Sequence, residues 1–328
     1  MKKKIALVTG GYSGEAVISY RSAATIFAHL DKELYEVYNI DVSPLGWFYE
    51  EENGTKIAVE KNDFTIKVND RLISFDVVFI GMHGTPGEDG KLQGYFDILG
   101  LPYTSCSAAT SALTFNKRYT VAVASMAGIP VAESVHLFKH SPYNIDSILK
   151  LKLPYFVKPN NGGSSIGMSK VTKPSQLEAA IDKAFAEDDQ VLIEEMIQGQ
   201  EFTVGVFKSD GEITVLPITE IVAHNDFFDF EAKYEGKSLE ITPAEIKEEW
   251  KAVLEATAKK IYTVFNCSGV VRIDFIYNKE QNKAYMLEIN TVPGQSDASV
   301  IPQQVRAKGW QLSDFYTKIV EEAMRTTS

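Results

Sequence analysis

Short apolar runs that end at glycines and lead into helical patterns recur in the first third of the chain. The run "KIALVT" (4–9) ends at Gly10-Gly11, and a helix is predicted from about Val17 to Leu30. The strand "EVYNIDV" follows, and the run "FDVVFIGMHG" (75–84) precedes the predicted helix "GKLQGYFDILG". Strand, glycine turn and helix in repetition are typical of a parallel sheet with helices on its faces. We therefore predict a Rossmann-like α/β domain over residues 1–104, with ligands at the carboxyl ends of its strands.

The pattern changes after residue 104. A helical pattern extends over "SAATSALTFNKRYTVAVASMAG", and a strand, a glycine-rich loop and a second strand are predicted in "YFVKPNNGGSSIGMSKV". A helix is then predicted over 174–186, before the strand "QVLIEEMI". After "GQEFTVGVF" the strands follow one another without helices, which indicates antiparallel pairing. We predict an α+β region in two parts, residues 105–190 and 191–328.

The polar segment 222–245 lacks periodicity and is predicted to be a long loop. An amphipathic helix is predicted over 245–265, and the strands "GVVRIDFIY" and "KAYMLEIN" close the sheet. No internal repeat is present.

The last two strands carry polar side chains two residues apart, and such side chains point to the same face of a strand. The pairs are Arg272 with Asp274, and Glu288 with Asn290. The short polar connection predicts a hairpin, which brings both pairs into one patch. A salt bridge or a solvated sheet edge would explain a single acid, because a buried carboxylate needs compensation. Three side chains with ligand oxygens on adjacent strands favour a magnesium site. Phosphate oxygens would complete the coordination shell of the ion.

A metal that binds phosphates suggests a phosphate cradle. Lys158 precedes a glycine-rich loop that contains Ser164 and Ser165, whose N–H groups can bind phosphate. The loop is not a P-loop, since its lysine comes before the glycines. The alternative interpretation of this segment is a plain hairpin with an exposed lysine. For Lys117, the alternative is an ordinary exposed lysine on a helix.

Composition narrows the function classes. The 328 residues include 45% hydrophobic and 23% charged ones, as in soluble globular proteins. A net charge of -11 argues against a nucleic-acid partner. The two cysteines lack metal-ligand spacing and predict buried thiols in a reducing compartment. The apolar part of "MKKKIALVTGG" is too short for a secretory signal, and no stretch approaches a membrane span, so we expect a cytoplasmic protein.

Several catalytic patterns are missing. "GGYSGE" lacks the GxGxxG spacing of dinucleotide sites, GxSxG is absent, and the five histidines have no zinc-ligand spacing. His83, in "MHGTPGEDG", is interpreted as a structural turn histidine.

Seven ordered motifs together resemble the D-alanine–D-alanine ligases of the ATP-grasp superfamily. They are "GGYSGEAVISYRSA", "HGTPGEDGKLQG", "FVKPNNGGSSIGMSKV", "EEMIQGQEFTVGV", "FDFEAKY", "VRIDFIY" and "LEINTVPG". The match covers nearly the whole chain. It implies a two-lobed ATP-grasp fold after the N-terminal domain, and the joining of two D-alanine molecules through an acyl phosphate for peptidoglycan synthesis.

The resemblance also implies roles for single residues. Glu15 lies at the ammonium of the first D-alanine, and Ser164 and Tyr234 are its hydrogen-bonding partners. Arg272 and Gly294 stabilise the oxyanion, and Ser299 contacts the carboxylate of the second substrate. These six are the implied catalytic and substrate-binding residues. ATP is held by Lys117, Lys158, Ser165, Glu194, Glu195, Glu201 and Lys233. Asp274, Glu288 and Asn290 are the ligands of two Mg²⁺ ions, which Mn²⁺ can replace.

The same resemblance implies a homodimer and a lid formed by the loop 222–245, which excludes water from the acyl phosphate. No nucleic-acid or membrane partner is implied. Gln295, Asp297 and Ala298 depart from the family pattern near the expected second substrate, and Ala16 departs beside Glu15. The alternative is therefore a related ligase that takes D-lactate or D-serine as its second substrate.

Overall fold

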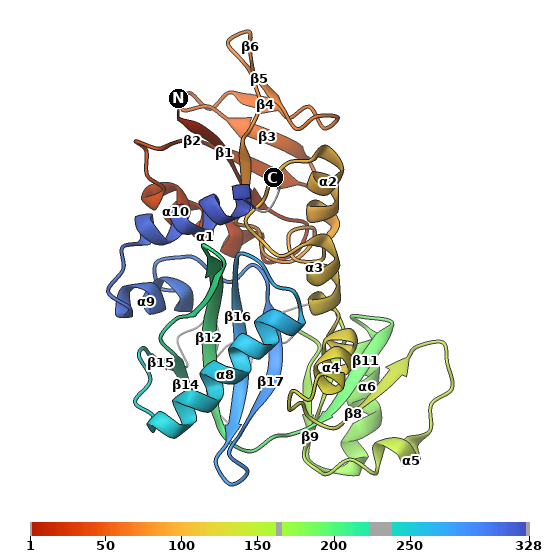
Figure 1. Ribbon diagram of the computed structural model, residues 1–328. Helices are drawn as coiled ribbons and strands as arrows, with labels where there is room; N and C mark the ends of the chain where they lie inside the picture. The colour runs from red at the N-terminus through yellow and green to blue at the C-terminus, as the bar shows by residue number, and fades with distance from the viewer. Residues whose placement is uncertain (1, 162–165, 224–237, 326–328) are drawn as a thin grey trace.

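The computed structural model describes residues 2–161, 166–223 and 238–325. An N-terminal sheet lies at the top of Figure 1, and two further sheets lie side by side below it. The lower left sheet comes from the C-terminal part of the chain, and the lower right sheet comes from the middle. Several hydrophobic cores hold these sheets and their helices together.

The N-terminal sheet has the strand order β4-β3-β2-β1-β7. The elements of this region are β1 (Lys3–Gly10), α1 (Ala16–His29), β2 (Tyr35–Ser43), β3 (Gly46–Glu50), β4 (Lys56–Ala58), β5 (Ile66–Val68), β6 (Arg71–Ile73), β7 (Val77–Ile80) and α2 (Lys91–Leu99). Strands β2, β1 and β7 are parallel, as predicted. Strands β3 and β4 extend the sheet in antiparallel fashion and were not expected from the sequence.

The central region contains the four-stranded antiparallel sheet β10-β9-β11-β8. Its elements are α3 (Ala108–Phe115), α4 (Lys117–Met126), β8 (Ser134–Phe138), α5 (Ile145–Ile148), β9 (Tyr155–Pro159), β10 (Ser169–Val171), η1 (Pro174–Gln176), α6 (Leu177–Phe185) and β11 (Gln190–Glu195). The helical stretch predicted here is divided in two. Asn116 has an extended backbone, and its side chain accepts the N–H of Tyr119 as the N-cap of α4.

The C-terminal sheet is antiparallel, with the order β15-β14-β12-β16-β17 and β13 also paired to β12. Its strands and the helix packed on them are β12 (Gln200–Ser209), β13 (Glu212–Val215), β14 (Thr219–Ala223), β15 (Ser238–Ile241), α8 (Glu248–Val264), β16 (Val270–Asn278) and β17 (Lys283–Asn290). The hairpin predicted for the last two strands is confirmed.

The loop predicted over 222–245 is partly wrong. Its first two residues end β14, and residues 238–241 form β15, which pairs with β14. The alternation of apolar and polar residues in "SLEI" is too short to stand out in a polar segment. Residues 224–237, where the lid was expected, lie outside the described residues.

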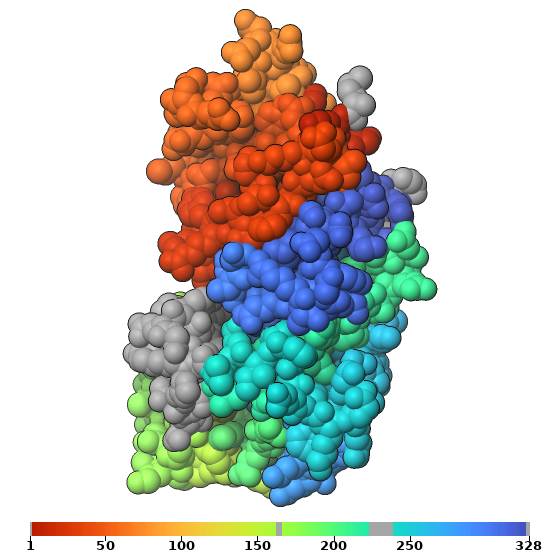
Figure 2. Space-filling view, turned by 90° about the vertical axis from the view of Figure 1, so that its left-hand side faces the viewer, coloured from red at the N-terminus to blue at the C-terminus, as the bar shows by residue number. Residues whose placement is uncertain are grey.

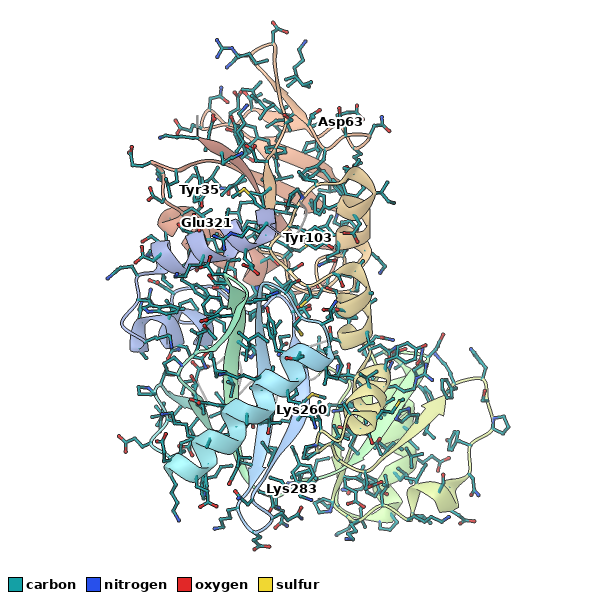
Figure 3. The ribbon with its side chains drawn as sticks, in the orientation of Figure 1. Tyr35, Asp63, Tyr103, Lys260, Lys283 and Glu321 are labelled. Atoms are coloured by element: carbon teal, nitrogen blue, oxygen red, sulfur yellow. The ribbon has the colours of Figure 1, made fainter. Side chains whose placement is uncertain are left out.

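Two helices follow the last strand: α9 (Val300–Ala307) and α10 (Leu312–Arg325). Helix α10 packs against α1 and β7 of the N-terminal region as well as against β12 of the C-terminal sheet, and its residue Phe315 shares a core with Ile5, Phe79 and Phe207. Figure 2 shows the C-terminal segment directly against the N-terminal one. At one end of this contact Tyr35 of β2 faces Glu321 of α10 (Figure 3).

Both cysteines are buried and free, as predicted. Cys106 and Cys267 lie beside each other, and the hydrogen bond from Cys106, together with burial, raises the pKa of the Cys267 thiol. No helix in the described part of the chain is long and apolar enough to span a bilayer.

Candidate active site

A cleft of about 330 Å³ opens between the N-terminal region and the C-terminal sheet. Its walls come from α1, the turn after β7, the start of α4, strands β12, β16 and β17, and the loop that leads into α9. Nine residues predicted from the sequence line it: Glu15, Lys117, Glu201, Arg272, Asp274, Glu288, Asn290, Gly294 and Ser299. Residues more than 280 positions apart therefore meet in one cavity.

The polar patch on the β16–β17 hairpin has the register that the sequence predicted. Asp274 lies opposite Glu288, and Arg272 lies opposite Asn290. The Arg272 Nε and Nη2 atoms donate to the two Asp274 oxygens at 2.9 and 2.8 Å. Such a two-pronged contact fixes the guanidinium in the cleft wall.

The patch is chemically suited to a hard divalent cation, because carboxylate and amide oxygens are the preferred protein ligands of Mg²⁺. Among the described residues no three His, Cys, Asp or Glu side chains form a metal cage, so phosphate or water oxygens must complete the shell. Asp274 already accepts from Arg272, from Thr203 Oγ1 at 2.6 Å and from Asn290 Nδ2 at 3.3 Å. A carboxylate has about four lone-pair positions. A metal ion at Asp274 would therefore have to compete with the present hydrogen bonds of this carboxylate.

Glu15 enters the cleft from the turn between β1 and α1. The strand ends at Gly10, whose φ of +91° and closeness to Val42 leave no room for a side chain: an added Cβ would lie 2.6 Å from the Val42 carbonyl oxygen. The chain then turns, and Glu15 becomes the N-cap residue of α1. Ser13 Oγ accepts the N–H of Glu15 at 3.3 Å. A carboxylate at this helix start suits a ligand's ammonium group.

His83 and Glu88 also line the cleft, although the sequence assigned neither to the site. Burial, and then the charge of Glu15, raise the pKa of Glu88 to about 8. Burial also lowers the pKa of His83 to about 4, against a hydrogen bond to Val292 that raises it. The turn histidine predicted from the sequence is thus a neutral imidazole inside the cleft wall. Their position directly after β7, at the carboxyl edge of a parallel sheet, was the available signal.

Other lining residues were missed as well. Thr203 lies two residues after Glu201 on β12 and so shares its face, which period-two alternation could have revealed. Glu240 lies on the short strand β15 that the sequence did not predict. Arg21, on α1, had no distinguishing signal in the sequence.

Three predicted ATP-binding residues lie on the central sheet rather than among the lining residues of the cleft. Lys158 of β9 forms an ion pair with Glu194 of β11, and both side chains are largely buried. The Glu195 carboxylate accepts the N–H of Lys152 at 2.8 Å.

Asn160, two residues after Lys158, connects the end of β9 to the start of α4, where Lys117 lies. Its carbonyl accepts the N–H of Lys117 at 3.2 Å, and its Oδ1 accepts the N–H of Arg118 at 2.8 Å. Lys117 at the start of α4 and Lys158 at the end of β9 are therefore held in a fixed relation.

Four predicted residues, Ser164, Ser165, Lys233 and Tyr234, lie outside the described residues.

Two of the residues that depart from the family pattern direct their side chains to other partners in the protein. Gln295 is 3% exposed, and its Oε1 accepts the hydroxyl of Tyr316. Asp297 pairs with Arg306 on the surface. Neither side chain is among the lining residues of the cleft, whereas Ala298 is, and their nearness to a second substrate stays a prediction. Side-chain direction in a loop has no period from which it could be predicted.

Comparison with known proteins gives consistent matches along the chain. Residues 4–106 match the family model "D-ala D-ala ligase N-terminus", and residues 123–321 match "D-ala D-ala ligase C-terminus". A D-alanine–D-alanine ligase of Flavobacterium johnsoniae is 47% identical over 320 residues, which cover 97% of this chain and 98% of that protein.

Two solved structures illustrate the likeness in fold. The VanG D-Ala:D-Ser ligase of Enterococcus faecalis superposes with a TM-score of 0.87 at 30% identity, and covers 98% of this chain and 100% of that one. The D-alanine–D-alanine ligase of Bacillus anthracis complexed with ATP gives 0.80 at 28% identity, with 99% and 98% covered.

Proposed function

The chain belongs to the D-alanine–D-alanine ligase family, and from that premise we propose that it joins two D-alanine molecules into D-alanyl-D-alanine with ATP. ADP and phosphate are the other products. The dipeptide would serve peptidoglycan synthesis.

One observation carries the proposal: a single cleft combines three kinds of group that this reaction needs. Glu15 suits the ammonium of the first D-alanine, and the patch of Asp274, Glu288 and Asn290 suits Mg²⁺ with nucleotide phosphates. Arg272 and the N–H of Gly294 suit the negative oxygen of a tetrahedral intermediate. A non-catalytic nucleotide-binding protein would have no use for the third group.

The chemistry begins with the carboxylate of the first D-alanine, whose oxygen attacks the terminal phosphorus of ATP as ADP leaves. Lys117 and Lys158 would neutralise phosphate charge in this step, and Glu201 would accept hydrogen bonds from the ribose. Bound Mg²⁺, or Mn²⁺ in its place, would supply further charge neutralisation through Asp274, Glu288 and Asn290.

The amine of the second D-alanine then attacks the acyl carbon. Arg272 and Gly294 would stabilise the oxyanion that forms, and the bond to phosphate breaks as the peptide bond is completed. Ser299, the N-cap residue of α9, would bind the carboxylate of this second D-alanine. Glu194 and Glu195 would lie near the adenine.

The direct test measures ADP release with D-alanine, L-alanine, D-serine and D-lactate, offered singly and in pairs, and identifies each product by mass spectrometry. D-alanine alone should suffice for ADP release and should give D-alanyl-D-alanine. In equimolar mixtures the homodipeptide should predominate at neutral to mildly alkaline pH. Mainly the ester or D-alanyl-D-serine would instead establish the alternative, a ligase with another second substrate.

We also propose that the protein acts in the cytoplasm as a homodimer. Its buried free cysteines suit a reducing compartment, and two-fold dimers are the commonest oligomers. Sedimentation velocity should give twice the chain mass of 36.4 kDa.

A further inference from the structure

The loop Thr291–Gln295, which contains Gly294, is held by buried polar groups from three different elements. It connects β17 to α9 and forms one wall of the cleft. Thr291, Val292 and Gln295 are each at most 5% exposed. The loop therefore lies inside the protein, and its backbone position depends on what it contacts there.

The first contacts come from α1 and the turn after β7. Ser22 Oγ accepts the N–H of Gln295 at 3.1 Å and lies 2.9 Å from His83 Nε2. His83 and Glu88 both hydrogen-bond to the backbone of Val292. Since the Ser22 hydroxyl is free to donate to Nε2, the imidazole carries its proton on Nδ1, where the Val292 carbonyl accepts it. Both ends of the Val292–Gln295 segment are thus fixed to the N-terminal domain.

The remaining contact comes from α10. The Tyr316 hydroxyl donates to Gln295 Oε1 at 3.3 Å, and Tyr316 is fully buried. Tyr316 also packs edge-on against Phe79 of β7. The Gln295 side chain therefore points away from the cleft, into the interface between α10 and the N-terminal sheet, although its backbone N–H follows directly after Gly294.

We propose that Gln295 is a positioning residue: its contacts with Tyr316 and Ser22 hold the Gly294 N–H in the place where it stabilises the oxyanion. The inference rests on the proposed ligase function and extends it to residues that touch no substrate. Oxyanion donors act because they are fixed before the reaction, and a shift of about 1 Å can lower a rate roughly 100-fold.

The hydrogen bond between Gln295 and Tyr316 also implies that a double variant should recover activity that a single variant loses. Removing one partner leaves the other polar group buried without a hydrogen bond, whereas replacing both by apolar groups of similar shape is close to neutral. Gln295→Met or Tyr316→Phe alone should therefore displace the loop more than the double variant does. Tyr316→Phe removes one hydroxyl only and so provides a mild variant.

The experiment measures the kcat for dipeptide formation, the KM for ATP, and the affinity for a phosphinate analogue of D-alanyl-D-alanine in the presence of ATP and Mg²⁺. The tetrahedral phosphorus of this analogue copies the intermediate. Gln295→Met should lower kcat and weaken analogue binding by the same factor, roughly 10- to 100-fold. The KM for ATP should stay within about twofold, and the double variant should recover at least half of the lost kcat.

Tyr262→Phe is the matched control. Its hydroxyl is also buried and donates to the Gly269 carbonyl at 2.8 Å, in a core separate from the cleft loop. This variant should lower the melting temperature without changing analogue affinity.

The outcomes separate the inference from the proposed function. Wild-type protein that makes no dipeptide would contradict the function itself. An active wild type with unchanged kcat and analogue affinity in both single variants would overturn the role of Gln295. The role would likewise be overturned if the losses of kcat and analogue affinity simply parallel the loss in melting temperature. A double variant with a lower kcat than both single variants would also overturn it.

Discussion

At the scale of single residues, the cleft puts groups in protonation states or contacts that they would not have in water. Glu88 and His83 are both shifted toward their neutral forms by burial. Asp274 is held by Arg272, Thr203 and Asn290. The two predictions below test a charge that the reaction uses and a neutral ring that the fold requires.

Glu288→Gln should abolish ADP release with D-alanine while the protein stays folded. The amide keeps the size of the side chain but removes the charge that the proposed metal site needs. Activity is measured as ADP release, and folding by circular dichroism and thermal melting. Glu280→Gln, in the exposed turn of the same hairpin, should behave as wild type. A melted but proportionately active Glu288→Gln protein would show that Glu288 serves the core instead.

His83 should contribute a loss of stability in mild acid. Its pKa is lowered from 6.5 to about 4, so between these values the unfolded chain binds the extra proton. This group alone lowers the free energy of unfolding by roughly 3 kcal/mol as pH drops from about 6.5 to 4, whereas Glu88, whose pKa is raised from 4.5 to about 8, acts in the opposite direction above pH 4.5. Urea titrations across that range measure the slope.

His83→Gln isolates this contribution, because glutamine keeps one donor and one acceptor but does not titrate. The stability of the variant relative to wild type should therefore rise as pH falls from about 6.5 to 4. His140→Gln, at an exposed position, should keep the wild-type slope. Identical slopes for all three proteins would refute the assignment of acid sensitivity to His83.

At the scale of secondary-structure elements, α10 completes the core of a domain that begins at the other end of the chain. Phe315→Ala should lower the free energy of unfolding by about 3–5 kcal/mol, since the side chain is fully buried in the core that α10 shares with both sheets and packs edge-on against Phe207 of β12. Chemical denaturation measures the change. Glu321→Ala, exposed on the same helix, should stay within about 0.5 kcal/mol of wild type. A small effect of Phe315→Ala would mean that α10 adds little to this core.

What the sequence could predict at this scale depended on pattern length. The β16–β17 hairpin was predictable, with its polar face, because two long apolar strands carry polar residues two positions apart and the connection is short. Strands β4, β5 and β6 have three residues each, too few to show a period. The break at Asn116 interrupts an otherwise continuous helical pattern for one residue only.

For the site, the common position of Asp274 and Glu288 in the cleft wall was predictable, because their spacing on two paired strands puts both on one face. Side-chain directions that depend on contacts between distant segments were not predictable. Gln295 points toward α10 because of Tyr316, and no local rule links these two positions. The packing of α10 on the first domain is a long-range event of the same kind.

At the scale of the whole molecule, the cleft lies where separate cores meet, so a ligand bound there contacts several of them at once. ATP with Mg²⁺ should stabilise the folded protein by about 2.7 kcal/mol at a concentration 100 times its Kd. Scanning calorimetry should show a higher melting temperature with ATP and Mg²⁺ than with ATP and a chelator. Glu288→Gln should lose the metal-dependent part, and NAD should give little shift. An equal shift with NAD would contradict a site specific for ATP.

The return of α10 to the first sheet has a consequence for biosynthesis. Ile5 and Phe79 leave the ribosome early, but the residues of α10 that share their core, such as Phe315, are translated last among its members. At typical elongation rates of 5–20 residues per second, roughly 15–60 s separate Ile5 from Phe315. During that interval α1 can cover its part of this face of the nascent β-sheet, but the part that α10 covers stays exposed and available to chaperones. The core that Ile5 and Phe79 share with α10 therefore cannot be completed until α10 has been synthesised.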